Sequence, residues 1–263
     1  MNFLLTNDDG IDAPGLWAAS RALAELGRVL IVAPNANYSG YGAALPPERE
    51  AYCEAYPASG VTMPGIAAFS LAAPPAVCAQ VGLSGALSRM SIELVVSGIN
   101  HGANLGRDVL YSGTVGAALT AYLLGKPAIA ISLDAKSGGV DHWNTAAWCL
   151  KEIIKSRTID SIVDQPLLNA NIPNRPIGQL TGIEITSLGA TSCLDRYTIS
   201  MSHEHTVRFQ QQPASTALDG PGSDAWALAN GSVSLTPLRL FPDIMYMSSA
   251  QDCYDRLQLA SAF

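Results

Sequence analysis

Two adjacent aspartates, Asp8 and Asp9, are the residues of this sequence whose types and spacing best suit chemistry. They follow a short apolar run, Phe3–Leu5, and lie among turn-forming residues. Like charges in a partly desolvated cleft repel, so the pair is costly unless a cation neutralises it. A divalent metal ion is the simplest neutraliser. Two aspartates that cap the following helix through its dipole are the alternative.

Two further polar clusters follow apolar runs: Ser39 comes after Val29–Ala33, and Asn100 comes after Leu94–Val96. Ligands of open parallel sheets bind beyond the carboxyl ends of the strands, so the three clusters should meet at one sheet edge. Two carboxylates, a hydroxyl and an amide oxygen form a hard, all-oxygen set that suits Mg²⁺ or Mn²⁺. We therefore predict one divalent cation per subunit, held by Asp8, Asp9, Ser39 and Asn100.

Hydroxyl-bearing and small residues, Tyr111–Ala118, are typical of a helix start that can accept an anion. Free N–H groups and the helix dipole attract negative charge there. An ordinary N-cap is the alternative. Five residues near this seat are predicted to bind the phosphate or the rest of the substrate: Asn7, Asn104, Ser112, Gly113 and Thr114.

Strands and helices alternate along the first two thirds of the chain. Continuous apolar strands of this kind favour a parallel sheet covered by helices on both faces. Asp12 is the expected N-cap of the first helix. The sequence therefore predicts an α/β fold with a doubly wound, mostly parallel, Rossmann-like sheet. The main elements expected after Phe3–Leu5 are a helix around 16–26, strands at 29–33 and 94–96, a helix at 112–124, a strand at 128–133, a helix at 143–155 and a strand at 167–172.

The pattern changes from about Gly182. Strand-like pieces are then separated by polar turns, at 183–187, 197–201, 206–210 and 233–235, with one helix-like segment at 223–229. We predict a single domain over residues 1–263, in which residues 1–181 form the α/β core and residues 182–263 form a β-rich appendage.

Composition excludes several classes of function. The net charge is −7 and no Lys/Arg cluster occurs, which argues against binding to a nucleic-acid polymer. The five cysteines are scattered, which favours reduced thiols over a zinc site. The apolar stretch 115–133 is broken by Gly125-Lys126-Pro127, so no membrane span is expected and the protein should be cytoplasmic. His203-Glu204-His205 has the alternating spacing of an exposed strand rather than of a metal site.

The known signatures of other nucleotide-binding and hydrolytic sites are missing. The glycines of Gly98–Gly106 do not form a dinucleotide fingerprint, and the sequence holds neither a P-loop nor a nucleophile elbow.

Long segments of the chain resemble the SurE family of survival-protein phosphatases. The segments that carry the resemblance are Leu5–Gly15, Val32–Pro34 with Ser39-Gly40, Val96–Gly106, Asp108–Ala118, Asn169–Pro173 and Val233–Leu238. The resemblance spans nearly the whole chain. Three segments depart from the family pattern: Asn35–Tyr38, Ala73–Cys78 and Ala190-Thr191.

The resemblance implies a metal-dependent 5′/3′-nucleotidase, sometimes also active on short polyphosphate, that binds Mg²⁺ or Mn²⁺ at the positions matching Asp8, Asp9, Ser39 and Asn100. It also implies a homodimer or homotetramer in which the C-terminal appendage is exchanged between subunits. Nucleoside monophosphates are the expected substrates.

Hydrolysis of a phosphate monoester requires a barrier lower by about 20 kcal/mol or more, which a few hydrogen bonds do not supply. We therefore expect a metal ion to polarise the phosphate and position the attacking water, with Asp8 and Asp9 as catalytic residues and Asp9 as the proton acceptor. Two rivals remain open: a non-catalytic nucleotide or phosphate sensor, and a phosphatase with an aspartyl-phosphate intermediate.

Overall fold

The structure, a computed structural model, describes residues 1–47, 50–56, 65–135, 139–156, 166–190, 196–203, 206–212 and 219–239. Side chains are described for these residues except at 196–197, 202–203 and 211–212. Within these ranges the longest and most apolar helices still fall short of what a membrane crossing requires.

The predicted α/β fold is confirmed. A nine-stranded, mostly parallel sheet has the strand order β3-β4-β2-β1-β5-β6-β7-β11-β8, and a separate two-stranded sheet joins β9 to β10. The strands are β1 (Asn2–Thr6), β2 (Arg28–Pro34), β3 (Cys53–Ala55), β4 (Ile66–Leu71), β5 (Leu94–His101), β6 (Ala128–Leu133), β7 (Leu167–Ile172), β8 (Gly182–Ile185), β9 (Arg196–His203), β10 (Thr206–Gln212) and β11 (Ser232–Pro237).

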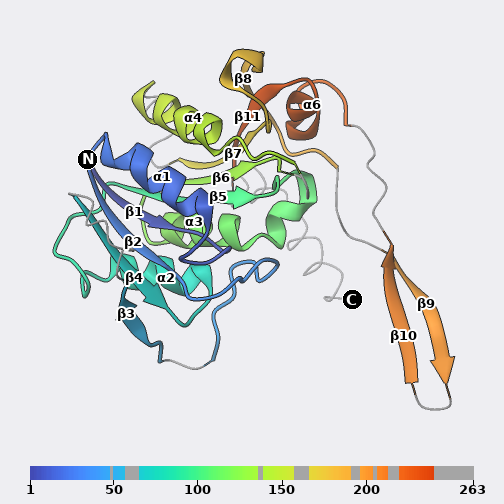
Figure 1. Cartoon of the computed structure of the whole chain (residues 1–263), viewed down its shortest axis with the longest axis horizontal. Coiled ribbons are helices and arrows are strands. Elements are labelled where there is room, and N and C mark those ends of the chain that lie inside the picture. The colour runs from blue at the N-terminus through green and yellow to red at the C-terminus, as the bar shows by residue number, and fades with distance from the viewer. Residues whose placement is uncertain are drawn as a thin grey trace, which may run out of the picture.

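Helices cover both faces of the sheet (Figure 1). The α-helices are α1 (Pro14–Ala24), α2 (Pro75–Leu83), α3 (Gly113–Leu123), α4 (Trp143–Lys155) and α6 (Asp224–Ala229), and the short 3-10 helices are η1 (Gly106–Leu110) and η2 (Ile177–Gln179). Helices α1 and α4 pack together on one face, and α2 and α3 pack together on the other. Strands such as β1, β2 and β6 are buried almost throughout, because each lies between two helical layers.

The chain order and the parallel pairing bring distant loops to one edge. Strands β2, β1, β5, β6 and β7 are neighbours and run in parallel. The loops that follow β1, β2 and β5 therefore leave the sheet at the same side. The sheet thus places Asp8, Ser39 and Asn100 at one edge, as the order of apolar runs predicts.

The predicted N-cap of the first helix is wrong. The N-cap of α1 is Ala13, which lies in the extended region, and no side chain caps the helix. Pro14 begins the helix because its fixed φ suits the first turn and it has no N–H to satisfy. Asp12 instead accepts a hydrogen bond from the Tyr56 hydroxyl.

The predicted boundary of the appendage at Gly182 also needs correction. Strand β11 pairs antiparallel with β7 and parallel with β8, so both β8 and β11 belong to the main sheet. Local alternation identifies a strand but not its partner, which explains the difference. Among the elements that the structure describes, only the β9–β10 hairpin stands away from the body (Figure 1).

One part of the main sheet has no counterpart among the sequence predictions. Strands β3 and β4 extend the sheet beyond β2, and helix α2 packs against this end of the sheet. Helix α2 begins at Pro75, in a segment without the polar residues that mark one face of an amphipathic helix.

Candidate functional site

Asp8 lies buried against the N-terminus of α3. Its Oδ1 accepts a hydrogen bond from Thr114 Oγ1 at 2.6 Å, and its Oδ2 accepts one from the Thr114 amide at 3.1 Å. Burial raises the pKa of the Asp8 carboxyl, although hydrogen bonds from Thr114 and from the Gly113 amide act in the opposite direction. The anion that the start of α3 holds in this structure is therefore the side chain of Asp8.

Glycine is required at the first position of α3. A Cβ atom at Gly113 would lie 2.8 Å from Asp8 Cβ and 2.9 Å from Asp8 Oδ2. Contacts this short are not found between real Cβ atoms and their neighbours, so a larger residue would displace Asp8 or the helix. The small residues of the Tyr111–Ala118 segment permit this close approach.

Asp9 is partly buried beside Asp8 and contacts the end of β5. Its Oδ2 accepts a hydrogen bond from the His101 amide at 3.1 Å. Burial, and then repulsion from Asp8, raise the pKa of Asp9 to about 6. Among the ion pairs formed by the described residues, none includes Asp8 or Asp9. The two neighbouring carboxylates repel each other, and His101 is the basic side chain whose charge partly offsets this at Asp9.

The loop after β2 closes over Asp8. The Tyr38 amide donates to the backbone carbonyl of Asp8 at 2.7 Å. Ser39 is the residue after Tyr38, so this hydrogen bond brings the loop that carries Ser39 to the aspartate pair. Asn37 Oδ1 accepts a hydrogen bond from the Ser39 amide at 2.8 Å and thereby fixes the turn. Ser39 itself is exposed. Two of the residues that depart from the SurE pattern, Asn37 and Tyr38, thus still hold this loop.

Asn100 reaches the same edge from β5 and is half-buried. Its Nδ2 donates to the Gly102 carbonyl at 2.8 Å, so its Oδ1 is the atom left for a ligand. The next residue, His101, contacts Asp9 through its amide. Its Nε2 lies 3.3 Å from Asp141 Oδ2, and its ring packs 5.9 Å from that of Trp143.

Asn7 is buried and completes the edge from β1. Its Nδ2 donates to the Gly10 carbonyl at 2.8 Å. Its Oδ1 is also buried, and it has no hydrogen-bond partner. A buried polar atom without a partner is costly, which is why such atoms often mark the position of a water, an ion or a ligand.

The remaining predicted phosphate ligands are engaged within the protein. Ser112 Oγ accepts from the Val115 amide at 3.1 Å and so caps α3. Asn104 is buried, and its Nδ2 donates to Ser132 Oγ at 2.8 Å. Thr114 is bonded to Asp8. The structure thus brings Asp8, Gly113 and Thr114 into contact, whereas Asn104 is anchored to β6.

Three residues that matter here were not among the predicted site residues: Asn169 and Asn171 of β7, and Asp224 of α6. All three are fully buried and hydrogen-bonded to the loop between β5 and α3. Polar residues inside an apolar strand are the one signal that would have drawn attention to Asn169 and Asn171. Within the described ranges, no three His, Cys, Asp or Glu side chains cluster as metal ligands, so a metal at the site also needs hydroxyl or amide oxygens.

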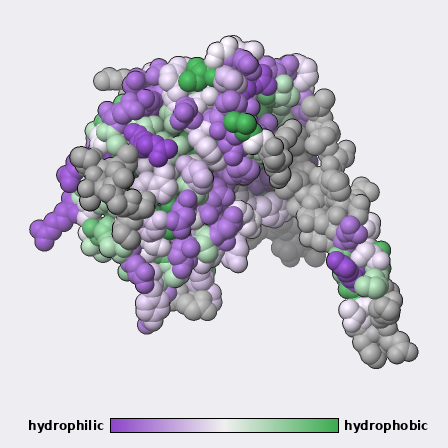
Figure 2. Space-filling model, in the orientation of Figure 1, coloured by the Kyte–Doolittle hydropathy of each residue, from purple (hydrophilic) through white to green (hydrophobic). Residues whose placement is uncertain are grey.

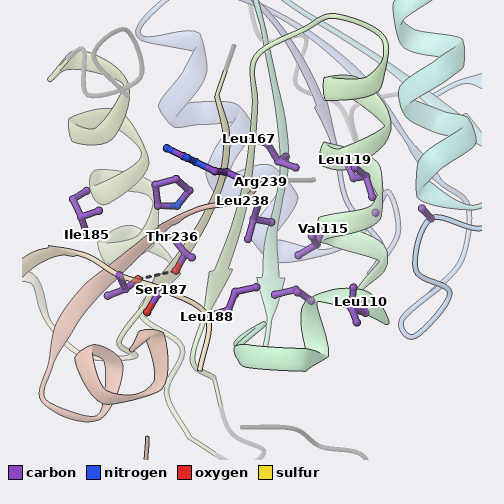
Figure 3. A pocket seen from close by; sticks show the side chains of 15 residues that line it. Leu110, Val115, Leu119, Leu167, Ile185, Ser187, Leu188, Thr236, Leu238 and Arg239 are labelled. Carbon is purple, nitrogen blue, oxygen red and sulfur yellow. Dashed lines mark hydrogen bonds between the residues drawn. The ribbon is translucent and has the colours of Figure 1, made fainter. Parts of the chain in front are cut away.

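One largely apolar pocket does not include the aspartate pair. It has a volume of about 550 Å³ and lies between α3, η1, β7 and the end of β11, with Val115 and Leu119 on one wall and Leu238 on another (Figure 3). None of the predicted site residues lines it. A second pocket, of about 670 Å³, lies between the loop before β3 and α2, and these residues do not line it either.

Comparison with known proteins identifies the family. The family model described as survival protein SurE matches residues 3–195. The chain is 33% identical to the 5′-nucleotidase SurE of Dehalococcoides mccartyi, over 98% of this chain and all of the relative. It is 37% identical to the 5′-nucleotidase SurE of Vibrio cholerae, over 91% of this chain and 92% of the relative.

A solved structure agrees. The crystal structure of the SurE protein from Aquifex aeolicus is similar with a TM-score of 0.81 and 31% sequence identity, covering 97% of this chain and all of that one. On the family model and on both relatives, the chain belongs to the SurE family.

Proposed function

We propose that this chain is a metal-dependent 5′-nucleotidase that removes phosphate from nucleoside monophosphates. The observation that carries the proposal is the pair of adjacent carboxylates, Asp8 buried and Asp9 partly buried, with which no Lys or Arg of the described residues forms an ion pair. Relatives that match over nine tenths of the chain or more are named 5′-nucleotidase SurE. Hydrolysis of 3′-nucleotides and of short polyphosphate is the finer part of the proposal.

The residues at this edge fit a hard divalent cation. Burial raises the pKa of both aspartates, so a dication would relieve an unfavourable local charge. Asn100 directs its amide nitrogen to the loop and leaves its oxygen available. We propose that Asp8, Asp9, Ser39 and Asn100 hold one Mg²⁺ or Mn²⁺, since oxygen ligands of this kind suit these ions.

When bound, the cation would polarise a phosphoryl oxygen and lower the pKa of a water molecule. The protein has to keep its carboxylates in place for this. Thr114 binds both oxygens of Asp8, so the carboxylate cannot rotate. The His101 amide binds one oxygen of Asp9, Oδ2.

Asp9 is suited to act as the proton acceptor. Its Oδ2 is bonded to the His101 amide, which leaves Oδ1 to receive a proton from the attacking water. Burial together with Asp8 raises the pKa of Asp9 to about 6 in the metal-free protein. A bound dication would lower this pKa, so the role of Asp9 as proton acceptor rests on its free oxygen.

The phosphate is proposed to lie between the aspartates and the start of α3. The N-terminus of α3 provides positive dipole charge. The unpartnered Asn7 Oδ1, an acceptor, suits a water molecule or the cation beside the phosphate instead. The proposed phosphate ligands on the loop before α3 and at the start of α3 are Asn104, Ser112, Gly113 and Thr114. Because the Gly113 and Thr114 amides already hold Asp8, they would have to be shared with the phosphate.

Phosphate release from AMP with Mg²⁺ or Mn²⁺, with and without a chelator, tests the proposal. We expect release that depends on the metal and is abolished in Asp8→Asn, which keeps the shape of the side chain but removes its charge. Near-normal turnover by Asp8→Asn would reject the scheme. Saturable nucleotide binding without release under every metal would identify a sensor instead, and a trapped covalent phosphoprotein would identify an aspartyl-phosphate enzyme. Parallel assays with 3′-AMP and tripolyphosphate test whether the protein also hydrolyses 3′-nucleotides and short polyphosphate.

We also propose that the protein is a homodimer, or a homotetramer built from dimers, in which the C-terminal part is exchanged. The observation that supports this is the β9–β10 hairpin, which projects from the body (Figures 1 and 2). It exposes Ile199, paired across the strands with Phe209, as well as Met201 and Val207. A two-stranded hairpin is marginally stable alone, so these side chains need an apolar partner surface. Sedimentation velocity showing only monomers would contradict this.

A further inference from the structure

The loop Gly102–Tyr111, which we call the β5–α3 loop, joins two parts of the candidate site. It begins directly after Asn100 and His101 and ends at Ser112. Two of its glycines have positive φ, 118° at Gly102 and 51° at Gly106. Glycine restricts the backbone least, so local preference does not fix the chain at these two positions. The helix η1 has backbone hydrogen bonds of its own, such as that from the Asp108 amide to the Leu105 carbonyl at 3.0 Å. The segment before η1, and the place of η1 against the rest of the protein, depend on contacts from elsewhere.

The first set of contacts comes from the sheet. One side chain, Asn171 of β7, binds both backbone groups of Asn104: its Oδ1 accepts from the amide at 2.8 Å, and its Nδ2 donates to the carbonyl at 3.0 Å. Asn169 Nδ2 donates to the same carbonyl at 2.8 Å. Ser132 accepts from the Asn104 side chain. Asn171 thus replaces the strand neighbour that this part of the loop lacks.

The second set comes from Asp224, at the start of α6. This carboxylate is fully buried. Its Oδ2 accepts from the Gly106 amide at 2.7 Å, and its Oδ1 accepts from the Gly189 amide at 2.9 Å and from the Ala225 amide at 2.8 Å. Hydrogen bonds to an ionised acceptor are about twice as strong as neutral ones. Asp224 therefore ties the loop to the end of the sheet that contains β8.

We propose that Asn171 and Asp224 are positioning residues, which fix the β5–α3 loop so that Asn104 and the start of α3 keep their places opposite Asp8. The inference rests on the proposed function. Neither residue is hydrogen-bonded to Asp8 or Asp9, so both act through the loop. The tolerance is small, because the Gly113 backbone already lies against Asp8 with no room for a methyl group.

A purely structural role is the competing explanation, since buried polar groups need partners in any protein. The two explanations differ in where a substitution acts. A structural residue lowers the stability of the whole fold. A positioning residue also loosens the loop specifically and lowers kcat while the protein remains folded.

The test uses the full-length protein loaded with Mn²⁺. Asn171→Leu removes both loop contacts at similar volume, and Asp224→Ala removes both acceptor oxygens. Asp224→Asn keeps the shape of the side chain and one acceptor oxygen, and should recover part of the loss. Ser232→Ala is the matched control, because Ser232 is a buried polar residue of β11 whose hydroxyl is bonded to Thr181 Oγ1 at 2.8 Å, away from the loop.

Amide hydrogen exchange of residues 102–111 and the kinetics of phosphate release from AMP are then measured. We expect exchange in the loop to become at least about tenfold faster in Asn171→Leu and Asp224→Ala. We expect kcat to fall about 10- to 100-fold, with KM changing less than about threefold, because misplacement by about 1 Å has effects of this size. Asp224→Asn should lie between wild type and Asp224→Ala, and Ser232→Ala should match wild type.

Loop exchange and kcat that stay at the wild-type level in Asn171→Leu and in both Asp224 variants would overturn the inference. Exchange that rises equally in all segments of the protein would also overturn it, because that is the structural outcome. If Asp224→Ala does not fold, Asp224→Asn carries the test. If wild type itself releases no phosphate, the proposed function fails, whereas the exchange measurement still decides whether these residues hold the loop.

Discussion

The carboxyl edge of the sheet and the β9–β10 hairpin differ in the kind of group that each leaves without a partner. At the edge, polar groups are buried or partly buried: the carboxylates of Asp8 and Asp9 repel each other, and Asn7 Oδ1 has no partner. On the hairpin, large apolar side chains such as Ile199 and Phe209 are exposed. Both are unfavourable for an isolated chain. A charged ligand would therefore stabilise the groups at the edge, whereas an apolar partner surface would stabilise the hairpin.

The largest effect on activity is expected from a steric clash at the carboxyl edge of the sheet. In Gly113→Ala the new methyl group meets Asp8 at 2.8 Å, so the carboxylate must move. We expect kcat/KM for AMP to fall about 100-fold. Gly178→Ala is the control, because a Cβ atom there meets nothing within 4 Å. Activity kept within about twofold of wild type in Gly113→Ala would show that the edge tolerates displacement, contrary to our interpretation.

A smaller effect is expected when only the hydrogen bond to Asp8 is removed. Thr114→Val deletes the hydroxyl that donates to Asp8 Oδ1 at 2.6 Å. Partners of metal ligands typically change affinity 10- to 100-fold, so we expect Mn²⁺ binding, measured by calorimetry, to weaken by about that factor. Thr114→Ser should restore most of it.

The same helix supplies a matched control for this substitution. Thr120→Val removes a hydroxyl that donates to the Gly116 carbonyl at 2.8 Å and does not contact Asp8. Equal loss of Mn²⁺ affinity in Thr114→Val and Thr120→Val would mean that the effect is one of helix stability, not of the site.

The edge should also respond to pH. Burial and Asp8 raise the pKa of Asp9 to about 6 in the metal-free protein, above its usual value of 3.8. Below pH 6 the folded protein therefore holds a proton that the metal must displace, and affinity falls as pH falls. We expect Mn²⁺ affinity to drop by up to about tenfold per pH unit between pH 6 and pH 5, and to change little between pH 7 and pH 8. An affinity that is the same at pH 5 and pH 7 would contradict this.

The smallest effect on the folded body is expected from the hairpin. Ile199→Ser with Phe209→Ser removes exposed apolar surface, so the free energy of unfolding of the monomer should change by less than about 0.5 kcal/mol. The proposed dimer should nevertheless dissociate, as measured by sedimentation. Gln210→Ser, an exposed polar position on the same hairpin, should leave assembly unchanged. A double variant that remains fully dimeric would remove the contrast between the two regions.

The fold was largely readable from the order of apolar runs. Strands β6 and β7 and helix α4 lie where the runs and their glycine and proline boundaries place them. Helix α2 was missed, because a helix without a polar face does not show the periodicity of an amphipathic helix. The place of β11 in the main sheet was also missed, since pairing depends on the path of the whole chain.

The candidate site was predictable to a different extent. The three loops that meet at the edge follow from parallel strand order, and the structure brings them together. The hydrogen-bond partners of the site side chains could not be predicted from strand order. Thr114 was predicted to face the phosphate, whereas in the structure it binds Asp8. Glu204, His205 and Thr191 lie outside the described residues.

The sequence by itself determined which segments gather at the edge, because Asp8 and Asp9 follow β1, Ser39 lies in the loop after β2 and Asn100 lies near the end of β5, and short-range patterning indicates where these strands end. Only the tertiary structure decided how those residues are held. The contact of Asp8 with Thr114 spans 106 residues, and that of Gly106 with Asp224 spans 118. Hydrogen-bond partners so far apart are selected by how the sheet and helices pack, and no local pattern encodes that choice.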